Sequence, residues 1–258
     1  MRRTIIRKIT WGGMALALSV AACSTYRERP IYYPVEVPPP KPQHADRRAW
    51  TPVPKPEPRR TAPLARRLAT KPRARYAPLR GVTIVVDAGH GGRDPGAAGV
   101  GPMPEEYVNL NVALHLARSL RARGAEVIMT RNSDRFISLD DRAAIADRTR
   151  ADLFVSIHAD AARRSSATGA TIYIARNASR DSRRAARHIE TAMNRAGVGC
   201  RGIRRAGFRV LVGHSRPAVL VECGFLTNPV EARRLGSPWY QARMAAIIAQ
   251  GITNHFGR

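Results

Sequence analysis

The stretch that decides the fold reads Val82-Thr83-Ile84-Val85-Val86-Asp87-Ala88-Gly89-His90-Gly91-Gly92. Residues 82–87 are rich in β-branched side chains, which pack well on a pleated sheet, so we predict a buried strand there. The glycines that follow allow a tight turn, because glycine tolerates backbone angles that other residues avoid. In open α/β sheets, binding sites gather beyond the carboxyl ends of the strands. This loop is therefore a candidate site.

Strand and helix patterns alternate along the rest of the chain. We predict further strands at 126–129, 153–157, 169–174, 208–212 and 218–221. We predict helices at 105–123, 138–150, 182–196, 232–235 and 241–256. Such alternation is typical of an α/β fold with a mainly parallel central sheet that is flanked by helices on both faces. We expect residues 81–258 to form this one domain.

Residues 1–22 have the features of a signal peptide. Four basic residues precede an apolar run at 11–22, which is short for a membrane span of ~20 residues. The run ends Val20-Ala21-Ala22-Cys23, which resembles a bacterial lipobox, where the chain is cut before the cysteine and the thiol receives lipid. By resemblance to lipoproteins, Ser24 favours the outer membrane, so we expect a periplasmic, lipid-anchored protein. The alternative is an ordinary signal peptide with a cysteine there by chance.

Residues 23–80 are predicted to form a disordered tether that is rich in proline and arginine. Residues 24–80 contain 13 of the 19 prolines of the chain, and such a sequence can neither sustain helix hydrogen bonds nor bury much apolar area. The same segment carries 14 basic and 4 acidic side chains, so much of the net charge of +25 lies outside the predicted domain. Charge alone suggests nucleic-acid binding, but no helix or aromatic set supports that class.

Three residues stand out as candidate metal ligands. His90 follows the first strand, Glu105 opens the first helix, and His158 ends the third strand. Zinc accepts imidazole nitrogen and carboxylate oxygen, and a set of two histidines and one glutamate leaves one position for water. Each residue alone also has an ordinary explanation. A histidine at a strand end is often a hydrogen-bonded surface residue, and a glutamate in a first helical turn is stabilised by the helix dipole.

Four segments resemble, in the same order, the motifs of zinc-dependent N-acetylmuramoyl-L-alanine amidases. They are Ile84-Val85-Val86-Asp87-Ala88-Gly89-His90-Gly91-Gly92-Arg93-Asp94-Pro95-Gly96-Ala97, Glu105-Glu106-Tyr107-Val108-Asn109-Leu110, Ala151-Asp152-Leu153-Phe154-Val155-Ser156-Ile157-His158-Ala159-Asp160 and Pro217-Ala218-Val219-Leu220-Val221-Glu222-Cys223-Gly224-Phe225-Leu226-Thr227-Asn228. From the first to the last, they extend from residue 84 to residue 228 of the predicted domain. The combination is far more specific than any one of the four segments.

The resemblance implies zinc (Zn2+) held by His90, Glu105 and His158, with Glu222 as the catalytic carboxylate. It also implies the reaction: zinc-activated water hydrolyses the amide bond between the lactyl group of N-acetylmuramic acid and the L-alanine of the stem peptide in peptidoglycan. Two alternatives remain. One is a zinc peptidase with a similar ligand set. The other is a wall-binding lipoprotein without catalysis, which the presence of all four site residues disfavours.

The sequence departs from the family pattern at two positions. Glu106 stands where the family often has lysine, so Glu105 and Glu106 compete as the ligand, and the register of residues 108–110 favours Glu105. Cys223 stands where the family usually has leucine. Because side chains alternate along a strand, Glu222 and Cys223 should point to opposite faces. We therefore expect Cys223 to be a small buried residue, without a disulfide to Cys200.

The segment after His158 also bears on regulation. Some amidases of this kind carry a long helical insertion there, which blocks the site until an activator binds. Here only ten residues, 159–168, separate His158 from the next predicted strand. We therefore expect an open site and no obligate activator. Asp87 and Asp94 are expected either to shape the loop around His90 or to form structural ion pairs.

We predict that Cys23 is the lipid-bearing first residue of the mature protein, because the lipobox-like segment ends there. Intact mass and detergent partitioning of the protein from its host would show this. The Cys23→Ser variant should lose both the lipid mass and the partitioning. A wild-type product that is cut elsewhere and carries no lipid would reject the prediction.

Overall fold

A computed structural model describes residues 77–101 and 103–257. The predicted signal peptide, Cys23 and nearly all of the predicted tether lie outside these residues. The strands are β1 (Thr83–Ala88), β2 (Glu126–Met129), β3 (Leu153–Asp160), β4 (Ala170–Ala175), β5 (Cys200–Ala206) and β6 (Ala218–Phe225). The helices are α1 (Glu105–Arg121), α2 (Leu139–Arg148), α3 (Arg180–Arg195), α4 (Arg209–Val212), α5 (Pro229–Leu235) and α6 (Pro238–Phe256). Among the described residues, no helix combines the length and the hydropathy that a membrane span needs.

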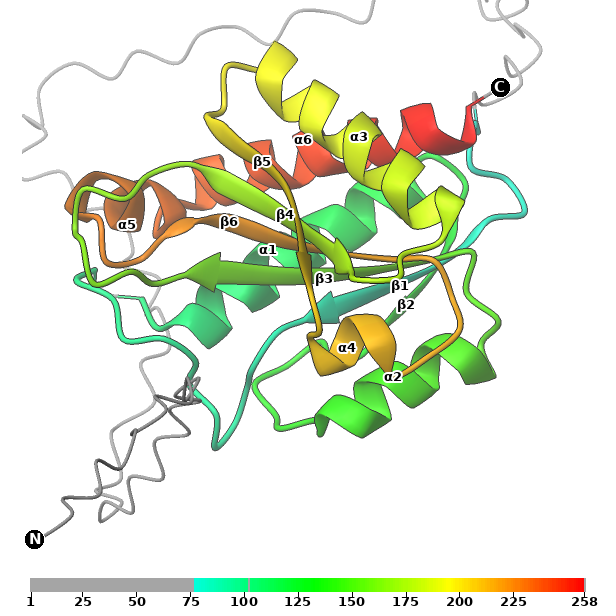
Figure 1. The fold of residues 1–258 in the computed structure, drawn as a ribbon, viewed down its shortest axis with the longest axis horizontal. Helices are drawn as coiled ribbons and strands as arrows, with labels where there is room; N and C mark the ends of the chain where they lie inside the picture. Colours follow the sequence, from blue (N-terminus) through cyan, green and yellow to red (C-terminus); the bar gives the residue numbers. More distant parts are fainter. Residues whose placement is uncertain (1–76, 102, 258) are drawn as a thin grey trace, which may run out of the picture. The chain divides into compact units, whose positions relative to one another are not determined.

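The six strands form one sheet in the order β2-β1-β3-β6-β4-β5. Neighbouring strands run parallel except for β4 and β6, which are antiparallel. Figure 1 shows α1, α3 and α6 on one side of the sheet and α2 and α4 on the other. The predicted α/β fold, with a mainly parallel sheet between two helical layers, is confirmed.

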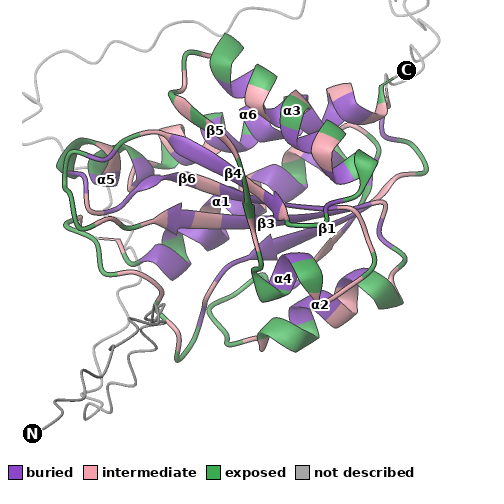
Figure 2. Cartoon of the chain, in the orientation of Figure 1, coloured by how far each residue is buried: buried purple, intermediate pink, exposed green. Residues whose placement is uncertain are grey.

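The sheet separates a large core from a small one. Leu153, Val155 and Ile157 of β3 are fully buried in the large core, together with side chains of α1, α3 and α6. Phe154, which points to the opposite face, belongs to a smaller cluster beneath α2 and α4. Strand residues therefore alternate between two apolar environments, which is why β1, β3 and β6 are buried almost throughout (Figure 2).

The predicted strand at 208–212 was wrong, and a strand at 200–206 was not predicted. Residues 208–212, predicted as a strand, contain the single helical turn α4, and Val210 and Leu211 bury together against the small core. A short apolar run does not distinguish a buried strand from a helical turn. The real strand, β5, was missed because its sequence Cys200-Arg201-Gly202-Ile203-Arg204-Arg205-Ala206 has little apolar alternation. It lies at the sheet edge, where charged side chains are tolerated.

The other elements agree with the predictions to within a few residues, and one of the differences affects the site. Strands β3 and β6 both continue beyond their predicted ends, so His158 and Glu222 lie inside paired strands. At the other end of the described chain, Leu79 is fully buried and its amide donates to the Arg123 carbonyl at 3.0 Å. Residues 77–80, which the sequence assigns to the tether, therefore pack onto the domain.

Candidate metal centre

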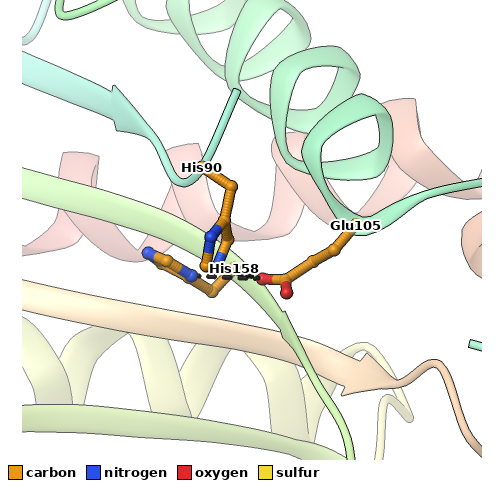
Figure 3. A group of neighbouring side chains, drawn as sticks. All are labelled: His90, Glu105 and His158. Atoms are coloured by element: carbon orange, nitrogen blue, oxygen red, sulfur yellow. Dashed lines mark hydrogen bonds and ion pairs between the residues drawn. The ribbon is translucent and has the colours of Figure 1, made fainter. Parts of the chain in front are cut away.

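His90, Glu105 and His158 come together from three elements. His90 follows β1, Glu105 is the first residue of α1, and His158 lies in β3. Glu105 Oε1 lies 3.2 Å from His90 Nε2 and 3.2 Å from His158 Nδ1 (Figure 3). The three potential ligand atoms all lie within 4.8 Å of one another. Glu106, the competing candidate at the sequence level, is not part of this group.

The backbone of residues 89–92 is shaped so that His90 faces His158. His90 has a φ of 60°, which is rare for residues with a side chain, and Gly91 and Gly92 also have positive φ values of 122° and 63°. At Gly89, a Cβ atom would lie 2.2 Å from the His158 ring. The two imidazole rings pack edge to face with centroids 5.0 Å apart. Glycine at position 89 is therefore a steric requirement of this site.

Two buried arginines hold the same loop through its carbonyl groups. Arg131 donates from Nε to the Ala88 carbonyl at 2.9 Å and from Nη2 to the Gly89 carbonyl at 2.8 Å. Arg142 donates to the Ala88 carbonyl at 2.6 Å and to the His90 carbonyl at 2.7 Å. Sequence reasoning missed both, because arginine is abundant in this chain and nothing in their spacing separates them from surface residues.

Asp87 anchors Arg142 from the end of β1. Its carboxylate is fully buried and accepts hydrogen bonds from Arg142 at 2.8 Å, Ser156 at 2.6 Å and Thr130 at 2.7 Å. Burial opposes ionisation of this group, but Arg142 and the two hydroxyls hold the Asp87 pKa below its usual value. Asp87 has both expected roles: it forms a structural ion pair with Arg142, and Arg142 in turn holds the loop around His90.

Asp94 orients the His90 ring. Asp94 Oδ2 lies 2.8 Å from His90 Nδ1, and Asp94 Oδ1 accepts the Gly96 amide at 3.2 Å. When Nδ1–H donates to this carboxylate, Nε2 presents its lone pair towards Glu105 and His158, as a metal ligand does. Burial lowers the His90 pKa, but the Glu105 and Asp94 carboxylates raise it to about 9 without a metal.

Glu105 is fixed as a carboxylate anion. The Ala97 amide donates to Oε2 at 2.6 Å, and the Asn109 side chain and the Ala159 amide donate to Oε1 at 3.0 and 3.2 Å. Burial raises the Glu105 pKa, but the hydrogen bonds and charges of His158 and His90 bring it far below its usual range. Glu105 is therefore ionised, which is the form that a metal ligand requires.

The donor set and its spacing fit a zinc ion. Zinc–nitrogen and zinc–oxygen bonds are ~2.0–2.1 Å, so neighbouring ligands of a tetrahedral site lie about 3.3 Å apart. Both nitrogen–oxygen distances in the group are 3.2 Å. Two imidazoles and one carboxylate form the ligand set of catalytic zinc sites, which leave a fourth position for water or substrate.

Glu222 lies beside this group on the neighbouring strand. Its Cα pairs with that of His158 across the β3–β6 ladder. Its Oε2 atom is buried and has no hydrogen-bond partner among the described residues. Burial raises the Glu222 pKa to about 7, and the Asp160 and Glu105 carboxylates add to this effect. The next residue, Cys223, points into the large core and is 2% exposed. Cys223 and Cys200 are both free thiols, as expected.

A cavity of about 530 Å³ opens over these groups. His90, His158 and Glu222 line one part of it. Phe136, Leu139 and Phe208 are among the apolar residues that line another part, and each is partly exposed. The site therefore combines a metal-binding group, an unpaired carboxylate and an apolar wall.

Comparisons with known proteins identify relatives of the whole domain. The family model Amidase_3, described as N-acetylmuramoyl-L-alanine amidase, matches residues 84–254. The chain is 37% identical to the amidase LytC of Bacillus subtilis over 181 residues, which is 69% of this chain and 36% of LytC. It is 31% identical to the amidase AmiA of Escherichia coli, over 72% of this chain and 80% of AmiA. The catalytic domain of the amidase CwlV of Paenibacillus polymyxa is similar in structure, with a TM-score of 0.63, 37% identity and coverage of 67% of this chain and 97% of that domain.

We predict that the purified protein contains about one zinc ion per chain, because two imidazoles and one carboxylate lie together and both nitrogen–oxygen distances match those of a zinc site. Elemental analysis should show a sharp loss of zinc in His90→Ala and in His158→Ala. The control is His115→Ala, which removes a histidine of α1 outside the group. Equal zinc in all four proteins would contradict the assignment.

Proposed function

The chain belongs to the N-acetylmuramoyl-L-alanine amidase family, and from this membership we propose a zinc-dependent mechanism that uses four of its residues. The activity is that of a peptidoglycan amidase: it cleaves the amide bond between N-acetylmuramic acid and the L-alanine of the stem peptide. His90, Glu105 and His158 hold the zinc ion, and Glu222 is the catalytic carboxylate. The proposal rests on one observation: the three ligands lie together, within a domain that matches the amidase family.

A zinc ion held by His90, Glu105 and His158 would supply an activated water and would polarise the carbonyl that is attacked. The protein keeps the ligands in place: Asp94 orients His90, and the Ala97 and Ala159 amides fix Glu105. Because these contacts exist before any substrate binds, little reorganisation is needed during the reaction.

Glu222 moves the proton in this mechanism. The attacking water loses a proton to the carboxylate, its oxygen joins the lactyl carbonyl carbon, and the bond to the L-alanine nitrogen breaks. Glu222 then delivers the proton to the leaving nitrogen, which departs as an amine. Two observations support this role: Glu222 lines the cavity beside His158, and one of its oxygens has no partner among the described residues.

The place of action is a separate proposal, which rests on the N-terminal sequence. We propose that lipid on Cys23 anchors the protein in the periplasm, at the outer membrane, and that residues 24–76 carry the catalytic domain to the wall. These segments lie outside the described residues, and their sequence features alone support the anchor.

The family match argues against a peptidase, and the intact set of site residues argues against a binding protein without catalysis.

The mechanism predicts that Glu222→Gln lowers turnover on peptidoglycan by about 10²–10⁴-fold, the typical contribution of general acid–base catalysis. Mass spectrometry of the wild-type digest should show free stem peptides that begin with L-alanine and an intact glycan. The zinc content of Glu222→Gln should equal that of the wild type. As a control, Glu190→Gln changes a carboxylate of α3 outside the cavity and should retain full turnover.

Two results would contradict the role of Glu222. Nearly unchanged turnover in Glu222→Gln would reduce it to an anchor of the local structure, because glutamine is a near-isostere. Loss of zinc together with activity would make Glu222 a ligand and would require a new assignment for Glu105.

We also predict that the purified protein releases stem peptides from purified peptidoglycan without any added protein. Strand β3 ends at Asp160 and β4 begins at Ala170, so the segment between them is short, and none of residues 161–169 lines the cavity. The rate of peptide release, measured with and without an extract of the host, checks this. Activity that appears only with the extract would show that another part of the chain closes the site.

A further inference from the structure

A row of side chains leads from the cavity to the edge of the sheet. Leu220 of β6 lines the cavity, its Cα pairs with that of Tyr173 in β4, and Tyr173 pairs with Arg204 in β5. Directly paired residues point to the same face of a sheet, and neighbouring strands lie ~4.8 Å apart. Arg204 therefore shares the face of Leu220, with its Cα about 10 Å away.

The same face carries the proposed catalytic carboxylate. Glu222 lies two residues beyond Leu220 in β6, so both side chains point the same way, and its Cα pairs with that of Thr171 in β4. The Tyr173 ring, which lies between Leu220 and Arg204, contacts the ring of Phe208 with centroids 5.1 Å apart. Because Phe208 lines the cavity, Arg204 lies just beyond the cavity wall, on the side of β5.

Arg204 is exposed, and within residues 77–257 it has no hydrogen bond or ion pair to its side chain. Its neighbours differ in this respect. Arg201 donates to the Thr168 carbonyl at 3.1 Å and lies over the Phe225 ring, and Arg209 pairs with Asp140. Burial raises the pKa of Asp160 in β3, and the positive charge of Arg204 opposes this effect, but the two side chains do not form an ion pair. Arg204 is thus a cation beside the site whose hydrogen-bonding groups are available.

We propose that Arg204 forms a subsite that binds a free carboxylate of the stem peptide, close to the bond that is cut. The inference rests on the proposed function, in which the L-alanine end of that peptide lies at Glu222. Stem peptides are acidic, and an extended peptide advances ~3.3–3.6 Å per residue, so the second or third residue reaches the region of Arg204. A guanidinium group binds a carboxylate through two parallel hydrogen bonds.

A purely structural role for Arg204 makes a different prediction. β5 is the last strand of the sheet, and a charged side chain on an edge strand prevents pairing with other chains. In that role the charge of Arg204 matters for solubility but not for the choice of substrate. The dependence of activity on the charge of the substrate separates the two roles.

The test uses two soluble muramoyl-peptides that differ only at the carboxyl group of the second stem residue, which is free in one and amidated in the other. We expect the wild type to prefer the free carboxylate by about threefold to fivefold in kcat/KM, as for one exposed charge-assisted pair. In Arg204→Gln the ratio of the two kcat/KM values should fall to near one. Arg204→Lys keeps the charge and should retain part of the preference.

Arg205→Gln is the matched control. Arg205 is the next residue of the same strand, so its side chain points to the opposite face of the sheet. This variant removes one positive charge from β5 and should keep the full preference. An unchanged preference in Arg204→Gln, or an equal loss in Arg204→Gln and Arg205→Gln, would overturn the proposal.

Binding of the reaction product separates this proposal from the mechanism. In the Glu222→Gln background, calorimetry with the free stem peptide should show about threefold to fivefold weaker binding when Arg204→Gln is added. The amidated peptide should bind both proteins equally. Should the wild type not cleave the muramoyl-peptides, the proposed function fails, and this measurement still decides the role of Arg204. Equal binding of the free peptide to both proteins would overturn the subsite.

Discussion

The buried ion pair between Asp87 and Arg142 connects the sheet to the metal-binding loop. A charge taken out of water is costly unless it is paired and hydrogen-bonded, and both conditions hold here. Thr130 and Ser156 also donate hydrogen bonds to Asp87, while Arg142 donates to the Ala88 and His90 carbonyls as well. The buried guanidinium of Arg142 therefore neutralises Asp87 near the end of β1 and also holds the backbone that carries His90. A loss of Asp87 would leave Arg142 uncompensated and the loop without its support.

The metal ligands were predictable from the sequence, whereas their supports were not. His90, Glu105 and His158 stand in segments whose residue order is specific, and the structure brings all three together. Arg131 and Arg142 act from 40 to 55 residues away along the chain, and only the folded sheet shows that their side chains turn inward. An arginine on a polar helix face has the same local sequence whether it is buried or exposed, so no periodicity distinguishes the two cases.

The same holds for the fold: elements defined by their local sequence were predicted, and elements that depend on tertiary contacts were not. Strands with continuous apolar sequence, such as β1 and β3, were recognised because both of their faces are buried. β5 was missed because it pairs with only one strand and carries exposed arginines on both faces. Its pairing with β4, and not its composition, stabilises it. α4 was misread because two adjacent apolar residues, Val210 and Leu211, fit a strand and a helical turn equally well.

The single antiparallel contact in the sheet determines what surrounds the proposed catalytic carboxylate. Because β4 runs against β6, residues near its amino end, such as Thr171, lie beside Glu222 near the carboxyl end of β6. β5 follows β4 in parallel, and α3 packs on the large-core side of both strands. This arrangement extends the cavity side of the sheet by two strands, and α4 is the helix that packs there against β4 and β6. A parallel β4 would have brought its carboxyl end to this position instead, with a different set of side chains. The orientation of one strand therefore decides which residues contact the part of a bound substrate that extends beyond the metal-binding group.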